Sequence, residues 1–179
     1  MAYGWGGERV RLVPLDRDRH LANAIAWMND PEVTAWMLVG DAPITRLAEE
    51  EFFDRRMRGD SADVTFAVET LAGEHIGFTA LDRVDHRHGV ATTGSIIGRR
   101  DLWRQGLGTD LVLTRTRYAF EVLGLRLLLS EALADNVASI KMLGRCGYLE
   151  VGRIPRRYFK RGAWRDAVLF ALERPSAAP

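Results

Sequence analysis

Hydrophobic and polar residues alternate along several short segments of the chain, which is the pattern of a half-buried β-strand. Residues 64–69, Val-Thr-Phe-Ala-Val-Glu, alternate strictly, whereas residues 126–132 form a more continuously apolar run. The segments that predict strands are 8–13, 64–69, 75–81, 90–97, 126–132, 148–151 and 167–172. Strands are therefore expected along the whole chain.

Apolar residues at three- and four-residue spacing predict helices between these strands. Asp16 is a cap for a helix that ends near Met28, and Asp135 or Asn136 caps one that runs to Arg145. Pro31 marks another helix start. The remaining helical patterns cover residues 32–38, 44–58 and 111–123.

The order of these elements favours one mixed α/β sheet. Three consecutive strands form an antiparallel meander, and a strand-helix-strand unit follows it. We expect a mostly antiparallel, twisted sheet of about seven strands with helices on both faces. The 179 residues show no repeat or linker, which predicts a single domain over 1–179 with a core at 8–173 and flexible ends at 1–7 and 174–179.

Composition narrows the class of partner. The chain carries 25 basic and 24 acidic residues, so its formal net charge of +1 gives no electrostatic case for nucleic acid or membrane binding. The single cysteine, Cys146, excludes an internal disulfide and fits a reducing compartment. The first residues lack an apolar signal core, and no segment has the length of a membrane span. A cytoplasmic protein is expected.

A glycine-rich turn at residues 103–109, Trp-Arg-Gln-Gly-Leu-Gly-Thr, joins a predicted strand to a predicted helix. Backbone N–H groups and the helix dipole make such a turn an anion site suited to a phosphate. A dinucleotide fold would need a third glycine where Leu111 stands, and the Gly-Lys-Ser/Thr sequence of a P-loop is missing. The alternative is a helix start in which the glycines serve only the turn.

Four segments in order resemble the GNAT acetyltransferase superfamily, and in particular its RimJ/RimL-type branch. Residues 94–109 are similar to motif A, and residues 135–148, with Asn136, Ser139 and Gly147-Tyr148, are similar to motif B. Residues 27–33 match the opening helix of that branch, and residues 162–166 match its closing hairpin. Trp103 replaces the usual arginine or glutamine of motif A, a replacement common in this branch.

The resemblance implies acetyl transfer from acetyl-CoA to a primary amine, by direct attack in a ternary complex. The pyrophosphate would bind backbone amides of the turn, the pantetheine arm would pair with the strand at residues 96–98, and an N–H near Ile97 would stabilise the oxyanion. The implied cofactor-binding residues are Ile96, Ile97, Gly98, Trp103, Arg104, Gln105, Gly106, Leu107, Gly108, Thr109, Asn136 and Ser139. No metal is expected.

The catalytic residues are less determined. Leu143 stands where many members of the superfamily have a tyrosine acid, so Ser139 is the candidate to assist the departing thiolate. A lysine-like amine, whose pKa in water is roughly 10.4, must lose a proton before it attacks. Glu131 is the candidate base, with Glu69 or a chain of waters as alternatives. Cys146 is expected to be a buried apolar residue.

The acceptor groove of this architecture is lined by the first helices and the last hairpin. Candidate contacts are Trp27, Trp36, Tyr158 and Trp164, together with Met37 and Phe159. The acceptor is a protein N-terminus or a small-molecule amine, with polyamines, aminoglycosides and amino sugars as alternatives. A basic hairpin tip, residues 156–161, offers a contact to the CoA 3′-phosphate, to a partner or to solvent. The resemblance also suggests a homodimer. A CoA-binding regulatory module without turnover remains a rival.

Overall fold

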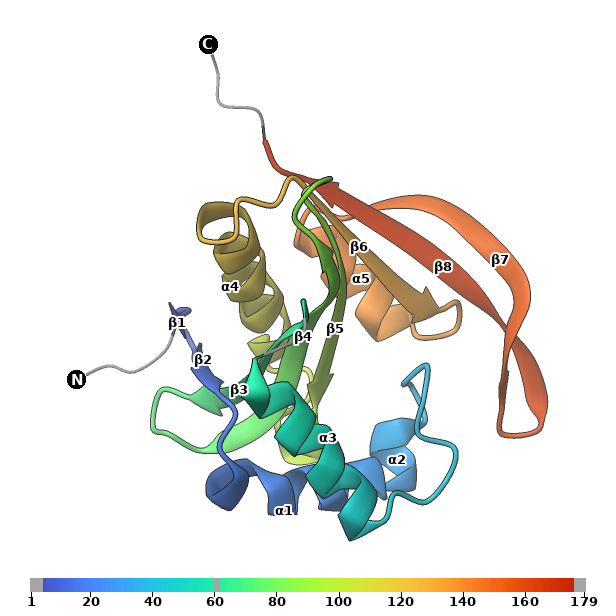
Figure 1. Cartoon of the computed structure of the whole chain (residues 1–179). Coiled ribbons are helices and arrows are strands. Elements are labelled where there is room, and N and C mark those ends of the chain that lie inside the picture. Colours follow the sequence, from blue (N-terminus) through green and yellow to red (C-terminus); the bar gives the residue numbers. More distant parts are fainter. Residues whose placement is uncertain (1–4, 60–61, 176–179) are drawn as a thin grey trace.

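The computed structural model describes residues 5–59 and 62–175, and these form one mixed sheet of eight strands (Figure 1). The strands are β1 (Trp5–Gly6), β2 (Val10–Pro14), β3 (Val64–Thr70), β4 (His75–Asp85), β5 (Val90–Ile97), β6 (Leu127–Leu133), β7 (Leu149–Lys160) and β8 (Ala163–Glu173). The helices are α1 (Arg17–Met28), α2 (Pro31–Thr34), α3 (Arg46–Arg58), α4 (Leu107–Glu121) and α5 (Val137–Arg145), with a 3-10 turn at Arg100–Leu102.

The strand order is β1-β2-β3-β4-β5-β6-β8-β7, and only the β5–β6 pair is parallel within the described residues. This order confirms the predicted mixed, mostly antiparallel sheet. Helix α4 makes the crossover between the two parallel strands, as a parallel pair requires. The long β7–β8 hairpin extends away from the body of the sheet (Figure 1).

Several predicted boundaries are wrong in an informative way. The final hairpin is far longer than the predicted segments 148–151 and 167–172, because most residues of the edge strand β7 are exposed and so carry no regular apolar alternation. The helix expected at 32–38 ends at Thr34, and α4 begins at Leu107 instead of 111. Trp5–Gly6 pair with β2, although residues 1–7 were expected to lie outside the core. Residues 1–4 and 176–179 lie outside the described residues.

Side chains on the two faces of β3 face two different apolar clusters. Phe66 and Val68 join a large cluster that also contains Leu111 of α4. Ala67 pairs with Phe78 of β4, which packs against the second, smaller cluster of Leu21, Ala24 and Phe53 from α1 and α3. The two clusters separate the helices into two groups, so the expectation of helices on both faces of the sheet is confirmed.

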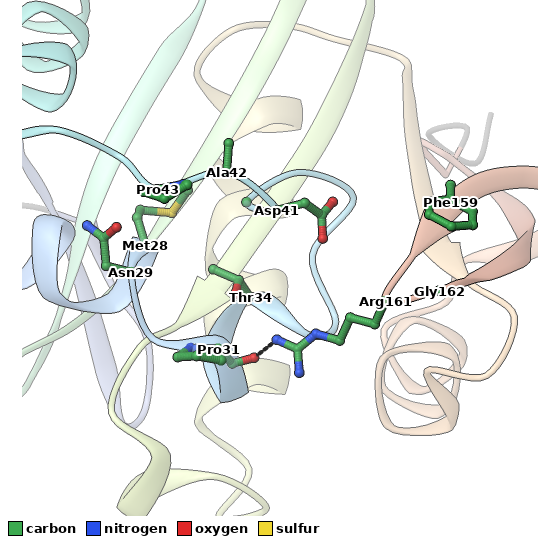
Figure 2. Close-up of a pocket in the computed structure, with 11 residues that line it drawn as sticks. Met28, Asn29, Pro31, Thr34, Asp41, Ala42, Pro43, Phe159, Arg161 and Gly162 are labelled. Atoms are coloured by element: carbon green, nitrogen blue, oxygen red, sulfur yellow. Dashed lines mark hydrogen bonds between the residues drawn. The ribbon is translucent and has the colours of Figure 1, made fainter.

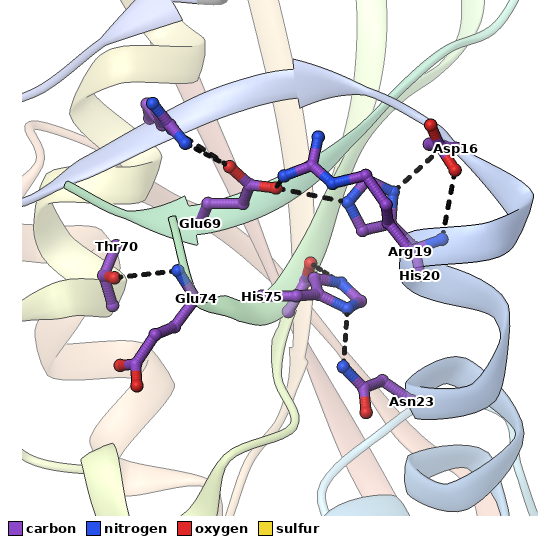
Figure 3. Close-up of polar contacts among 10 residues, drawn as sticks. Asp16, Arg19, His20, Asn23, Glu69, Thr70, Glu74 and His75 are labelled. Atoms are coloured by element: carbon purple, nitrogen blue, oxygen red, sulfur yellow. Dashed lines mark hydrogen bonds and ion pairs between the residues drawn. The ribbon is translucent and has the colours of Figure 1, made fainter. Parts of the chain in front are cut away.

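A charged cluster locks α1 to the sheet (Figure 3). Glu69 of β3 is fully buried and pairs with Arg11, Arg19 and His20. The backbone N–H of Asp16 donates to His20 Nδ1 at 2.9 Å, so the other ring nitrogen carries the proton that faces Glu69, 3.4 Å away. A carboxylate bound on several sides is a structural anchor.

Trp27 packs directly on the backbone of Gly98 at the end of β5. A Cβ atom added at Gly98 would lie 1.9 Å from Trp27 Cδ2, which is well inside contact distance. We expect Gly98→Ala to lower the free energy of unfolding by about 2 kcal/mol, because a core without space must shift to accept a methyl group. Gly94→Ala is the matched control, since a Cβ there meets no atom within 4 Å. Urea unfolding measures both, and equal midpoints would contradict the packing argument.

Candidate active site

Strands β5 and β6 separate part-way along their length and leave a fork in the sheet. They pair from Val90↔Leu127 to Thr93↔Ser130, and no pair follows among the described residues. On its other side β5 stays paired with β4 as far as Ile97. Residues 94–97 therefore have one open edge.

The hydrogen-bond pattern tells which residues face that edge. The N–H of Gly98 donates to the carbonyl of Ile76 in the line of β4 at 2.9 Å. Because bonded residues alternate along an antiparallel pair, Ile96 and Gly94 also face β4, whereas Ile97 and Ser95 face the open edge. The Ile97 carbonyl accepts a bond from the Trp103 indole at 2.8 Å. The N–H groups of Ser95 and Ile97 are thus on the open side.

The glycine-rich turn lies next to the end of β5. Arg104 and Gly106 have φ of 63° and 83°, so two left-handed residues turn the chain sharply into α4. Gly106 is the N-cap of α4 and has no side chain to cover the first amides of the helix. Asp110 is turned away from the loop, since it accepts bonds from the backbone N–H groups of residues 8–10. The geometry is that of an anion site at a helix start.

Two of the predicted turn residues, Trp103 and Gln105, use their side chains to stabilise the shape of the loop. The indole of Trp103 fixes the loop to β5, and Gln105 Nε2 donates to the Asp101 carbonyl at 2.8 Å. Arg9 donates to the Gln105 carbonyl from the other side. These contacts hold the turn in shape, and the amides of residues 104–109 remain the predicted ligand contacts.

The start of α5 approaches the fork from the β6 side. Asn136 is the N-cap of α5, because its side chain accepts a bond from the Ser139 N–H at 3.1 Å. Its Nδ2 donates to the carbonyl of Trp36 at 3.5 Å, which links α5 to the loop after α2. Ser139 is half-buried in the first turn of the helix, and Leu143 is buried one turn later. The predicted cap is confirmed.

Glu131 does not lie free beside the fork. Its Oε1 is 2.8 Å from Arg157 Nε, and Arg157 also bonds the Tyr158 hydroxyl at 3.1 Å. Burial raises the pKa of Tyr158, and the Glu131 carboxylate adds to that rise. The Glu131 carboxylate is therefore occupied by a cation of the hairpin. Glu69, the alternative base, is enclosed by its cationic partners and faces no open space (Figure 3).

A pocket of about 440 Å³ lies between the end of α1, the loop before α3 and the tip of the β7–β8 hairpin (Figure 2). It is lined by Met28, Asn29, Pro31, Thr34, Gly40, Asp41, Ala42, Pro43, Phe159, Arg161 and Gly162. Lys160 is buried and holds Asp41 at 2.7 Å, and Arg161 donates to the Pro31 carbonyl. The hairpin tip is thereby fixed against the first helices.

The predicted aromatic contacts occupy different environments. Trp27 is 9% exposed and packs on Gly98 and the His75 ring, so it supports the site from the core and offers little open surface. Trp36 and Trp164 are exposed, and Tyr158 is half-buried. Of the candidate contacts, Phe159, the ring partner of Trp164 at 5.3 Å, lines the pocket, and the others do not.

Comparison with known proteins decides the family. A family model described as an acetyltransferase (GNAT) domain matches residues 9–149, which include the fork, the turn and α5. The chain belongs to the GNAT acetyltransferases. It is therefore an acetyl-CoA-dependent N-acetyltransferase in its general chemistry.

Individual relatives agree with this assignment. The chain is 26% identical over 152 residues to the uncharacterized N-acetyltransferase p20 of Bacillus licheniformis, covering 82% of this chain and 83% of the relative. A GCN5-related N-acetyltransferase from Brucella melitensis is 28% identical with a TM-score of 0.75, over 94% of this chain and 77% of that one. Spermidine N-acetyltransferase from Vibrio cholerae, solved with CoA and spermine, has a TM-score of 0.84 at 21% identity, over 92% and 95%. That last likeness shows the fold.

Arg115 of α4 is a buried residue near the fork that the sequence did not predict. It is 1% exposed and contacts β5 directly behind the fork. Its position on a regular helix gave no signal, because arginine at helical spacing is normally a surface residue.

Burial raises the pKa of the Cys146 thiol, in keeping with the expected apolar role. The described residues contain no cluster of metal-ligating side chains and no helix able to cross a membrane.

Proposed function

We propose that this GNAT enzyme acetylates a primary amine by direct attack on acetyl-CoA in a ternary complex. The observation that supports this most is the fork itself, which opens beside an uncapped helix start and next to a pocket. The amides of residues 104–109 would hold the pyrophosphate, and the extended pantetheine arm would lie along the open edge of β5. The N–H groups of Ser95 and Ile97 are the candidate oxyanion donors.

Three cations near this path form no side-chain hydrogen bond or ion pair with the described residues and are candidates for the remaining phosphate. Arg104 lies on the turn, while Lys141 and Arg145 lie one turn apart on α5, and all three are exposed. The basic hairpin tip is a poorer candidate for the 3′-phosphate, because Arg157, Lys160 and Arg161 are already engaged. Cofactor contacts are therefore assigned to α4 and α5.

The acceptor amine is proposed to enter through the pocket of Figure 2. Met28, in its lining, follows Trp27, which touches Gly98 at the end of the open edge. The proton of the amine would leave through water, since Glu131 is ion-paired and Glu69 is enclosed. Ser139 remains a proposed contact to the cofactor. Trp103 and motif B support assignment to the RimJ/RimL-type branch, and a cytoplasmic homodimer remains our expectation.

The charged residues of the pocket indicate how many positive charges the acceptor carries. The lining contains one carboxylate, Asp41, which is compensated by Lys160, together with the guanidinium of Arg161. A polyamine needs several uncompensated carboxylates, so we propose an acceptor that carries a single amine, such as a peptide N-terminus or a small amine. This differs from the spermidine enzyme of similar fold.

An amine panel tests the proposal by following CoA release. We expect kcat/KM for singly charged amines to exceed that for spermidine by about tenfold. The second ammonium group of spermidine would find no free carboxylate in the pocket, and a tenfold difference corresponds to about 1.4 kcal/mol. Phe159→Ala should raise KM for the amine and leave KM for acetyl-CoA unchanged. Trp5→Ala is the control, because the exposed Trp5 of β1 lies outside the pocket lining and contacts the ring of Tyr118.

Three results would contradict the proposal. Preference for spermidine would support the polyamine alternative. CoA binding without thiol release across the panel would favour the regulatory module. Equal effects of the two aromatic variants on the amine KM would remove the pocket from the acceptor path.

A further inference from the structure

Arg115 is a buried cation without an anionic partner. Its Nη1 donates to Ser95 Oγ at 2.8 Å, to Thr79 Oγ1 at 3.2 Å and to the Gly94 carbonyl at 3.3 Å, and its Nη2 donates to the Tyr148 hydroxyl at 3.1 Å. No ion pair includes Arg115 among the residues that the structure describes, and its Nε has no hydrogen-bond partner there. A buried charge usually has a counter-charge, because desolvation costs several kcal/mol. An unpaired one points to a negative charge that arrives from outside.

The guanidinium sits behind the innermost part of the fork. Ser95 is two residues beyond Thr93, the last residue of β5 that pairs with β6. The residue is exposed, and its hydroxyl also shares a hydrogen bond of 2.9 Å with the hydroxyl of its register partner Thr79, which contacts the same guanidinium. Because Thr79 can be the donor of this bond, the Ser95 hydroxyl can accept from both Thr79 and Arg115 and keep its own proton for a ligand.

The path of the cofactor brings its sulfur toward this position. A pyrophosphate bound at the start of α4 lies beyond the outer end of the open edge, and residues 94–97 give that edge a length of about 13 Å. An extended arm that enters along the edge reaches its inner end with the reactive thioester. This step rests on the proposed binding of acetyl-CoA along β5.

We propose that Ser95 is a catalytic residue that donates a hydrogen bond to the departing CoA sulfur, and that Arg115 is the positioning residue behind it. The amine nitrogen forms the new bond to the carbonyl carbon, and the carbon–sulfur bond breaks with its electron pair on sulfur. The amine proton goes to water. The thiolate leaves as an anion that is stabilised by the Ser95 hydroxyl and the field of Arg115.

This arrangement supplies what Leu143 cannot. Leu143 holds the place of the tyrosine acid, and it is buried and apolar. The other titratable groups near Arg115 are Tyr148, which accepts its hydrogen bond, and Cys146, whose pKa is raised by burial and only partly lowered by Arg115. The raised pKa keeps the Cys146 thiol neutral, so Cys146 does not cancel the positive charge.

The test is the pKa of the CoA thiol in its binary complex, followed by the ultraviolet absorbance of the thiolate. We expect the bound thiol to titrate at least about one unit below free CoA, a tenfold shift. Arg115→Met and Ser95→Ala should each return the pKa toward the free value. Ser95→Ala should also lower kcat roughly tenfold with little change in KM for acetyl-CoA, since a hydrogen bond to a charged group contributes about 1.5–3 kcal/mol.

The controls separate the possible failures. Ser139→Ala, at a proposed cofactor contact, should change the thiol pKa less than Ser95→Ala does, and a larger change there would overturn the inference in favour of Ser139. If Arg115→Met does not fold, the thiol pKa measured in Ser95→Ala is the deciding result, because Ser95 is exposed and its replacement should leave the fold intact. Wild-type titration in Ser95→Ala with CoA still bound would refute the inference and leave the proposed function intact. Failure of the wild type to bind CoA would instead count against the proposed function.

Discussion

Replacing Gly108 by glutamate is expected to raise the Kd for acetyl-CoA by about 100-fold, or about 3 kcal/mol. Gly108 lies in the first turn of α4, and a Cβ added there meets no atom within 4 Å. The space in front of these amides is where the pyrophosphate is proposed to bind. A carboxylate in that space takes the place of the anion and repels it.

The same substitution should not harm the fold. Its backbone does not have the positive φ that marks Gly106, and an acidic residue in the first turn of a helix interacts favourably with the helix dipole. We therefore expect the melting temperature of Gly108→Glu to equal or exceed that of the wild type. Loss of binding in a stable variant would assign the effect to the ligand site.

Gly108→Gln is the matched control, because glutamine has the size of glutamate without its charge. We expect an intermediate Kd, weakened by the occupied space alone. Calorimetric titration with acetyl-CoA measures all three proteins. Wild-type affinity in Gly108→Glu would show that the pyrophosphate does not bind at this turn.

Local signals in the sequence predicted those parts of the fold that depend on neighbouring residues. Asp16 and Asn136 cap their helices as predicted, because a cap needs only a side chain and an amide three residues ahead. Residues 90–97 form a strand with the predicted bounds. The glycine-rich turn is also a local feature, since Gly106 has the left-handed conformation that glycine favours.

The features that were missed depend on contacts between distant residues. The β7–β8 hairpin pairs residues whose exposed side chains follow no apolar pattern, so its length was invisible in the sequence. Arg115 meets Ser95 and Thr79 only because α4 packs over β4 and β5. Glu131 is an acceptable base on sequence grounds alone, but the fold places Arg157 of the hairpin beside it. The sequence motifs predict a cofactor site at the turn, and the tertiary contacts show which side chains surround that turn.

The second large effect concerns acid, and it arises from His75 of β4. Its Nε2 lies 3.0 Å from the Gly77 carbonyl and its Nδ1 lies 3.0 Å from Asn23 Nδ2, which fixes the neutral ring with one donor and one acceptor (Figure 3). Burial, and then the neighbouring His20 ring, lower the pKa of His75 to about 4. Burial also lowers the pKa of His20.

A lowered pKa makes the folded state sensitive to acid. Below pH 6.5 an unfolded histidine binds a proton, whereas folded His75 stays neutral until about pH 4, so the unfolded state binds more protons between these values. The neutral His75 ring makes its full contribution to the free energy of unfolding above pH 6.5, and this contribution is lost as the pH falls from 6.5 toward 4. A shift of this size corresponds to about 3 kcal/mol of unfolding free energy.

Urea unfolding between pH 7 and pH 4.5 measures this loss. His75→Gln should flatten the pH dependence by most of this amount, while His86→Gln, at an exposed histidine in the β4–β5 turn, should follow the wild type. Comparison between variants is needed because burial raises the pKa of Glu49, which stabilises the fold in acid and opposes the histidine effect. That carboxyl group is common to all three proteins, so its contribution cancels in the differences. An unchanged slope in His75→Gln would show that His75 is protonated in the folded protein over this range, and the neutral ring between Asn23 and Gly77 would then be wrong.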